Sequence, residues 1–278
     1  MTRTTPAAFG DILREWRRRR RLTQIELAAA ADVSARHVCF LETGRAKPSR
    51  DMLLRLAEHL EVPPRERNAL LNAAGFSGLF TEQSFAGAGL DVVRQAIDAV
   101  LKGHEPYPAF AVDRHWTLVA SNGGFRPFLA GIDATLLQPP VNVLRLTLNP
   151  RGLGRRLANY QQWRSHVLDK LRRQIGASGD PLLIELLNEI RDYDLADSPV
   201  SDCAPAAGED WHKLVVPFQL LTESGTLSFY STTTIFGTPT DITLSELSIE
   251  SFFPADQATA NALLGLDRRQ TEENLPPR

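Results

Sequence analysis

The stretch Val33–Arg45, VSARHVCFLETGR, has the pattern of a short helix followed by a turn. Ser34 is a favourable N-cap, Val38 and Leu41 fall on one helical face, and Gly44 can supply the left-handed residue that ends a helix. If Val38 and Leu41 point inward, four other side chains point outward, namely Ala35, Arg36, His37 and Phe40. A basic and aromatic outer face favours a binding surface over the alternative, a face whose Arg and His are merely solvated.

Short helices are predicted on both sides of this stretch. Phe9, Ile12, Leu13 and Trp16 follow the i, i+3, i+4, i+7 spacing of one buried helical stripe. Further helices are expected from Thr23, from Ser34, over 49–60, and from Pro63 and Pro64 to Gly75. The first part of the chain, residues 1–78, is therefore predicted to be an all-α domain of five helices.

Charge is distributed unevenly along the 278 residues. Residues 1–75 contain 14 Arg and Lys against 9 Asp and Glu, a balance of +5, whereas the remainder has 17 against 24, a balance of −7. A basic first part indicates contact with a polyanion. The run Arg17–Arg21 is less informative, since basic residues at a helix C-terminus also suit the helix dipole.

The composition, 43% hydrophobic and 23% charged, is that of a globular protein. A core of this composition needs no disulfides or metal ions to stabilise it. Cys39 and Cys203 show neither a disulfide framework nor a zinc-ligand spacing, so a reducing, cytoplasmic setting is expected. Because no apolar run of about 18 residues occurs, we expect neither a membrane span nor secretion.

The rest of the chain predicts an α+β domain over 90–267, after a linker at 79–89 and before a flexible tail at 268–278. A helix is expected at 90–101, two strands around the turn Asp113–His115, and helices between 141 and 191. After a polar loop at 198–210, strand-like runs follow at 212–221, 225–236 and 243–253, then a helix at 256–266. Short turns between the last three runs favour a central antiparallel sheet over parallel winding.

The segment LTQIELAAAADVSARHVCFLETGRAKPS, Leu22–Ser49, resembles the Xre or lambda-repressor-like helix-turn-helix family. The resemblance implies that the helix opened by Ser34 enters the DNA major groove. It assigns base reading to Ala35, Arg36 and Phe40, with His37 adjacent. Phosphate contacts are assigned to Gln24, Thr43 and Arg45, and Lys47 extends the basic strip. Double-stranded operator DNA and a homodimer are the partners that follow.

A wider resemblance, carried by EPYPAFAVDRHWTLVASN, WRSHVLDKLRRQ and LSFYSTTTIFGTPTDITLSELSIESFFPAD, is to the MmyB-like branch of Xre regulators. It implies a C-terminal PAS-like ligand-binding domain, reported with a fatty-acid-like occupant in some members. We therefore expect a small apolar ligand. Candidate binding residues are Asn122, Phe125, Phe128, Leu129, Trp163, His166, Val167, Phe229 and Phe236.

Two other functions stay open. His166 and Asp169 lie one helical turn apart, as a general base and its orienter could, so the second domain could be an enzyme with autoregulatory DNA binding. It could also be a ligand-free dimerisation or protein-contact module. We expect no cofactor and no metal, because no Gly-rich phosphate loop and no His or Cys ligand spacing occurs. An apolar cavity would favour the sensor, a polar catalytic cleft the enzyme, and a filled core the contact module.

Overall fold

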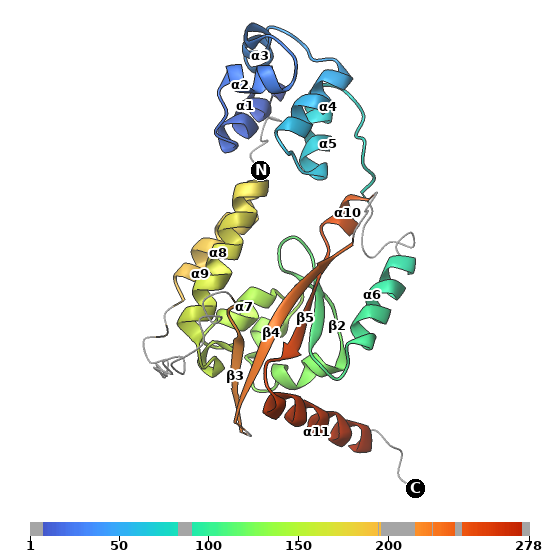
Figure 1. Ribbon diagram of the computed structural model, residues 1–278, viewed down its shortest axis with the longest axis vertical. Helices are drawn as coiled ribbons and strands as arrows, with labels where there is room; N and C mark the ends of the chain where they lie inside the picture. The colour runs from blue at the N-terminus through green and yellow to red at the C-terminus, as the bar shows by residue number, and fades with distance from the viewer. Residues whose placement is uncertain are drawn as a thin grey trace. The chain divides into compact units, whose positions relative to one another are not determined.

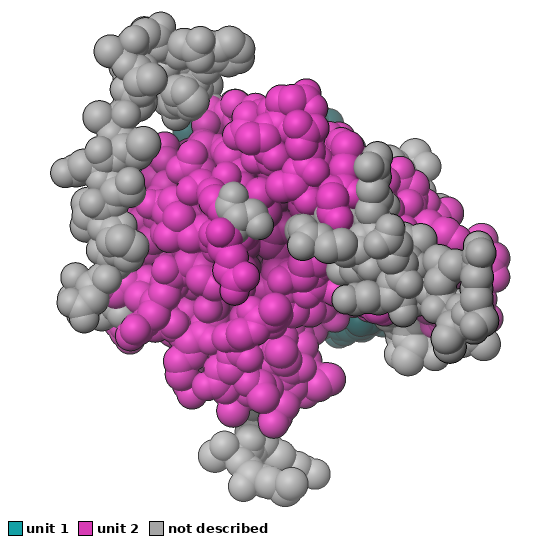
Figure 2. Space-filling view, turned by 90° about the horizontal axis from the view of Figure 1, so that it is seen from below, with its two compact units in different colours: residues 1–82, 176–179, 240–242 teal, residues 83–175, 180–239, 243–278 magenta. Residues whose placement is uncertain are grey.

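A computed structural model describes residues 8–82, 91–193, 195, 215–223, 225–236 and 241–273. These residues form two compact units, one made chiefly of the first 82 residues and one of most of the remainder, which Figure 2 distinguishes by colour. Most of the predicted linker, the loop at 198–210 with Cys203, and His212 lie outside the described residues.

The first unit is helical, as predicted (Figure 1). Its helices are α1 (Phe9–Arg19), α2 (Gln24–Ala30), α3 (Ala35–Glu42), α4 (Arg50–His59) and α5 (Pro64–Ala73). One apolar core joins all five and includes Leu13, Trp16, Leu27, Val38 and Leu41, each at most 3% exposed. Burial of these side chains stabilises the five helices, which are too short to be stable alone.

Local caps set the limits of the helix-turn-helix. The Ser34 hydroxyl accepts a hydrogen bond from the His37 backbone N–H at 3.1 Å, and Thr23 and Glu26 form a capping box at the start of α2. Gly44 has φ +72°, the left-handed conformation predicted for the residue that ends α3. The sequence signals for the start and end of α3 are therefore confirmed.

The second unit is an α+β PAS-like domain. It comprises α6 (Asp91–Gly103), β1 (Ala109–Val112), β2 (Leu118–Ser121), η2 (Gly123–Leu129), η3 (Ala134–Leu137), α7 (Val143–Leu148), η4 (Gly154–Arg156), α8 (Tyr160–Ser178), α9 (Pro181–Arg191), β3 (Phe218–Thr222), β4 (Gly225–Ile235), α10 (Ile242–Ser245), β5 (Ser248–Pro254) and α11 (Gln257–Glu273). The η elements are 3-10 helices.

The five strands make one antiparallel sheet in the order β2-β1-β5-β4-β3. The last strand in the chain lies at the centre, where Glu250 pairs with Phe110 of β1 and with Thr233 of β4. The predicted antiparallel sheet is confirmed.

Each face of the sheet supports a separate core. Successive side chains of β1 alternate, so Phe110 and Val112 join the larger core while Ala109 and Ala111 pack with Ile97 of α6. Figure 1 shows α6 on one side of the sheet and α8 and α9 on the other. The larger core, which contains buried side chains of α7, α8 and α9, therefore faces away from α6.

Some predicted boundaries were wrong. The run at 243–253 begins as the helix α10, from which Leu244 packs against the smaller core. In the run at 212–221, the described residues before Phe218 are not strand. The helix expected at 256–266 continues to Glu273.

Candidate functional site

The outward face of α3 is the first candidate site, and we call Ala35, Arg36, His37 and Phe40 the α3 outer face. Arg36 is exposed, whereas the other three are half-buried. Phe40 was expected to face outward with its ring exposed, but it is half-buried, and the Arg36 guanidinium carbon lies 5.2 Å from the centre of its ring. This cation–π contact shields the ring and gives Arg36 a preferred orientation.

The residues assigned to phosphate contact differ in how free their polar groups are. Arg45 and Lys47 are exposed in the turn after α3. Thr43 is exposed, but its hydroxyl donates to the Cys39 carbonyl at 2.7 Å. Gln24 is half-buried, and its amide donates to Glu42 at 2.8 Å. Arg45 and Lys47 are therefore the cations best placed to meet a phosphate.

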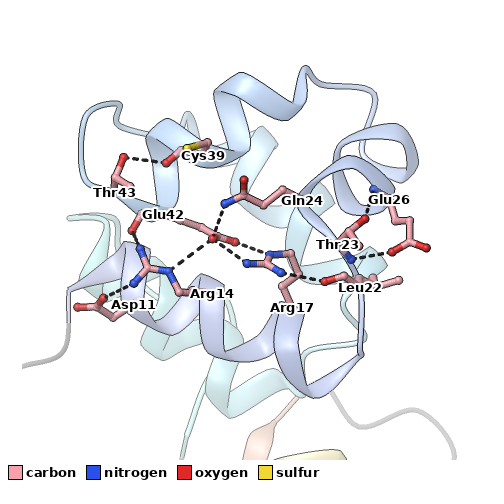
Figure 3. A network of polar contacts seen from close by, with 10 residues as sticks. All are labelled: Asp11, Arg14, Arg17, Leu22, Thr23, Gln24, Glu26, Cys39, Glu42 and Thr43. Atoms are coloured by element: carbon pink, nitrogen blue, oxygen red, sulfur yellow. Dashed lines mark hydrogen bonds and ion pairs between the residues drawn. The ribbon is translucent and has the colours of Figure 1, made fainter.

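A buried carboxylate behind this face connects three helices (Figure 3). Glu42, the last residue of α3, is only 3% exposed. Its two carboxylate oxygens accept from the Nε and Nη2 of Arg17 at 2.6 and 2.9 Å, and its backbone carbonyl accepts from Arg14 at 2.6 Å. With the bond from Gln24, these contacts fix α3 against α1 and α2.

The electrostatics of Glu42 follow from this geometry. Burial alone opposes its ionisation, but the hydrogen bonds from Arg17 and Gln24 and the nearby positive charges outweigh burial, so the pKa of Glu42 lies below its usual value. The same pairing raises the pKa of Arg17. Within the run Arg17–Arg21, Arg17 thus serves the fold, as does Arg20, whose Nε donates to the Leu60 carbonyl at 2.7 Å.

The second candidate site is a cavity in the larger core of the second unit. Its volume is about 60 Å³, several times the roughly 10–15 Å³ that one water needs. Most of the side chains around it are aromatic or aliphatic. Such a lining suits an apolar ligand.

Six of the nine predicted ligand residues line this cavity: Phe125, Phe128, Trp163, His166, Val167 and Phe229. The sequence did not indicate the other lining residues, which are Pro108, Phe110, Trp116, Val143, Leu144, Thr147, Leu153, Lys170, Phe218, Ser231, Glu250 and Phe252.

The other three predicted ligand residues lie outside the lining. Asn122 is 6% exposed, and its amide bonds to the backbone of Ala109, Leu101 and Tyr107, so it holds the chain around β1. Leu129 packs against the edge of the larger core. Phe236 packs on the smaller core.

Polar groups occur on the α8 and β5 sides of the cavity. The Nζ of Lys170 lies 2.9 Å from the Oε1 of Glu250, which also accepts from the Thr233 hydroxyl at 2.8 Å. The His166 ring stacks on Trp163, with ring centres 5.4 Å apart. Burial, followed by the charges of Lys170 and Arg173, lowers the pKa of His166.

The predicted enzyme alternative rested on His166 and Asp169. The Asp169 carboxylate accepts from the Arg172 guanidinium at 2.5 Å, while His166 stacks on Trp163. These contacts give both residues structural partners and do not bring them together as a base and its orienter.

His104 and His115 also have structural partners. The Nε2 of His104 lies 2.9 Å from the Phe252 carbonyl oxygen, and that of His115 lies 2.8 Å from the Oδ2 of Asp180, the N-cap of α9. In the part of the chain that the structure describes, no three His, Cys, Asp or Glu side chains gather as metal ligands would. No described helix combines the length and apolarity needed to cross a membrane.

Comparisons with known proteins bear on both units. A helix-turn-helix domain model matches residues 8–70, and the model of the MmyB-like transcription regulator ligand binding domain matches residues 93–266. No curated protein matches the chain. A solved structure of an RNA-binding Light-Oxygen-Voltage Receptor is 11% identical to this chain, with a TM-score of 0.23. The match covers 95% of this chain and 63% of that one, and the likeness is too weak to show a shared fold.

The two family models account for the two units in order, and the second spans more than half of the chain. Together with the helical first unit and the antiparallel sheet of the second, they show a DNA-binding transcription regulator that carries a ligand-binding domain. The chain belongs to the family defined by the MmyB-like transcription regulator ligand binding domain, and in this chain a helix-turn-helix domain precedes that domain.

Proposed function

We propose that the α3 outer face reads operator DNA in the major groove. The observation that carries this proposal is the arrangement of α3, which buries Val38, Leu41 and Glu42 and leaves Arg36 exposed on the opposite side. An Arg side chain can donate two hydrogen bonds to the edge of a guanine, the commonest specific contact in that groove. Ala35, His37 and Phe40 then exclude water or contact a thymine methyl group.

Phosphate contacts position this face. Arg45 and Lys47 are exposed just after α3 and contribute charge. Further phosphate contacts come from the hydroxyls of Ser34 and Thr43 and the amide of Gln24. These groups use the hydrogen-bonding capacity that their contacts within the fold leave unused. With few base-reading side chains, part of the specificity comes from the shape and stiffness of the DNA.

We further propose that the second unit binds a small, apolar, fatty-acid-like ligand and acts as a sensor, not an enzyme. The apolar cavity supports this proposal, because aromatic rings such as Phe125, Phe128 and Phe229 gain most from covering a hydrocarbon. The ligand changes operator affinity only if it binds two arrangements of a homodimer unequally. The cytoplasm is the proposed location.

Two experiments test these proposals. Mass spectrometry of solvent extracts of the purified chain is expected to detect a stoichiometric apolar compound, and its absence would favour the contact-module function.

Selection from random duplexes is expected to enrich one sequence bound at least about 10³-fold more tightly than unrelated DNA. Enrichment of no sequence would contradict operator recognition.

A further inference from the structure

The strongest polar groups of the cavity lie where α8 meets the sheet. His166 and Lys170 are four residues apart in α8, so they share one side of this helix, and both line the cavity. Glu250 of β5 lines it as well, and it forms an ion pair with Lys170. Because most of the other lining side chains are aromatic or aliphatic, a ligand with one polar end would place that end beside this part of α8.

Lys170 has one donor to spare. An ammonium group has three N–H donors, and two of them have oxygen acceptors here. The Nζ lies 2.9 Å from the Oε1 of Glu250 and 3.2 Å from the Thr233 hydroxyl oxygen. The third donor has no oxygen acceptor among the described residues, and the centre of the Trp116 ring lies 4.5 Å from the Nζ. A ligand oxygen can therefore bond to Lys170 without breaking its ion pair with Glu250.

His166 supplies a second donor at the same end of the cavity. Its imidazole stacks on Trp163, and neither ring nitrogen has a hydrogen-bond partner among the described residues. Both nitrogens remain accessible, since neither is among the buried polar atoms that lack a partner. An imidazole carries at least one N–H, even when it is neutral. His166 and Lys170 can thus donate to the two oxygens of one carboxylate.

Glu250 opposes a second negative charge but does not prevent its binding. It is 4% exposed, so its own charge needs Lys170 as a partner. The three N–H bonds of an ammonium group diverge tetrahedrally, so a carboxylate on the third donor lies closer to the Nζ than to the Glu250 oxygen. Because Coulomb energy falls with distance, attraction to Lys170 outweighs repulsion by Glu250.

We infer that Lys170 and His166 hold the polar end of the ligand, and that this end is a carboxylate. The assignment rests on the proposed function and deepens it: the fatty-acid-like ligand binds as its anion, with the carboxylate at α8 and the hydrocarbon chain among the aromatic rings. An acid anion then binds more tightly than an alcohol with the same chain.

Calorimetric titration of the full chain with decanoate and 1-decanol tests this assignment. At a pH well above the pKa of the decanoate carboxyl group, decanoate is expected to bind about tenfold more tightly than decanol, because hydrogen bonds to a charged group are stronger than those to a hydroxyl. The ratio of the two affinities is the readout, since a change in the apolar part of the cavity shifts both probes together.

Four variants examine the anchoring residues. Lys170→Met is expected to lower the ratio of decanoate to decanol affinity about tenfold. His166→Phe keeps a ring to stack on Trp163 but removes the N–H, so it should lower the ratio about fivefold. Glu250→Gln removes the opposing charge and should raise the ratio. Arg172→Met is the matched control: it removes one positive charge from an exposed position of α8 outside the cavity lining, and the ratio should change little.

The outcomes separate this assignment from the proposed function. If decanol binds as tightly as decanoate, or if the ratio is unaltered in Lys170→Met or in His166→Phe, the carboxylate anchor is overturned while the apolar cavity stands, because decanol still binds. Binding of neither probe overturns the proposed ligand function as well. Should Lys170→Met fail to fold because Glu250 loses its partner, the double change Lys170→Met and Glu250→Gln removes both charges together, and a ratio equal to that of Glu250→Gln alone would overturn the anchor.

Discussion

At the scale of single residues, Arg36 and Lys47 are expected to act on DNA in different ways. Arg36→Ala should weaken binding to the selected operator by roughly 1 to 3 kcal/mol and relax the preference at one base position. Lys47→Ala should weaken all sequences alike and reduce the slope of log affinity against log salt by about one. Fluorescence anisotropy with specific and unrelated duplexes over a salt series measures both. Full operator affinity in both variants would refute the assigned contacts.

Glu42 predicts a pH dependence of the first unit. Its pKa is lower in the folded chain than in the unfolded chain, where a glutamate titrates at about 4.3. The stabilisation is therefore present above that unfolded pKa and is lost as the pH falls through the folded pKa. Glu42→Gln keeps the shape but cannot ionise.

Hydrogen exchange of the α3 amides reads out this effect. The wild-type chain should be more stable than Glu42→Gln near neutral pH, and the difference should shrink as the pH falls below about 4.3. Glu58→Gln, a change at an exposed position of α4, is the control and should show a much smaller difference. A gap between wild type and Glu42→Gln that is constant with pH would exclude the buried ion pair as its source.

At the scale of elements, the contact of α1 with α3 depends on the lack of a side chain at Gly10. A Cβ there would lie 2.6 Å from the backbone oxygens of Leu41 and Glu42, closer than atoms can approach. Gly10→Ala should therefore push the end of α3 away and destabilise the first unit by about 1–3 kcal/mol, measured as faster hydrogen exchange of the α1 and α3 amides. Gly103→Ala is the matched control, since nothing lies within 4 Å of the position that its methyl group would take. Exchange that is unchanged or slower in Gly10→Ala would show that the close contact is not required.

Elements whose signals are local were predicted best. The helices of the first unit follow from apolar spacing and from caps such as Ser34 and Gly44, which need only a few neighbouring residues. The role of Glu42 was missed because its partners Arg17 and Gln24 lie 25 and 18 residues away. Its position was nonetheless a signal, since Glu42 follows Val38 by four residues and therefore lies on the same, inward face of the helix.

The errors in the predicted cavity have geometric causes. The segment after Asn122 is a 3-10 helix with three residues per turn, so Phe125 and Phe128 line up while Leu129 turns away. Phe229 and Phe236 are an odd number of residues apart, which places them on opposite faces of an extended chain. Lys170 and Glu250, 80 residues apart, meet only because β5 lies at the centre of the sheet.

At the scale of the whole molecule, sensing requires that ligand and operator influence each other equally. If an apolar ligand changes operator affinity by some factor, operator DNA must change ligand affinity by the same factor. Titrating decanol into the chain with and without saturating operator, and operator with and without decanol, gives the two factors. Unequal factors would mean that one titration reports something other than this coupling, and factors of one would refute regulation by this ligand.

The central claim is that the outer face of α3 lies against DNA, and photo-crosslinking tests it most directly. A benzoylphenylalanine placed at Arg36 should crosslink to bases of the selected duplex. Asn72 is exposed on α5, which packs on α1 and α4. The same group placed at Asn72 should not crosslink to the duplex. Crosslinks from position 72 and none from position 36 would contradict the account.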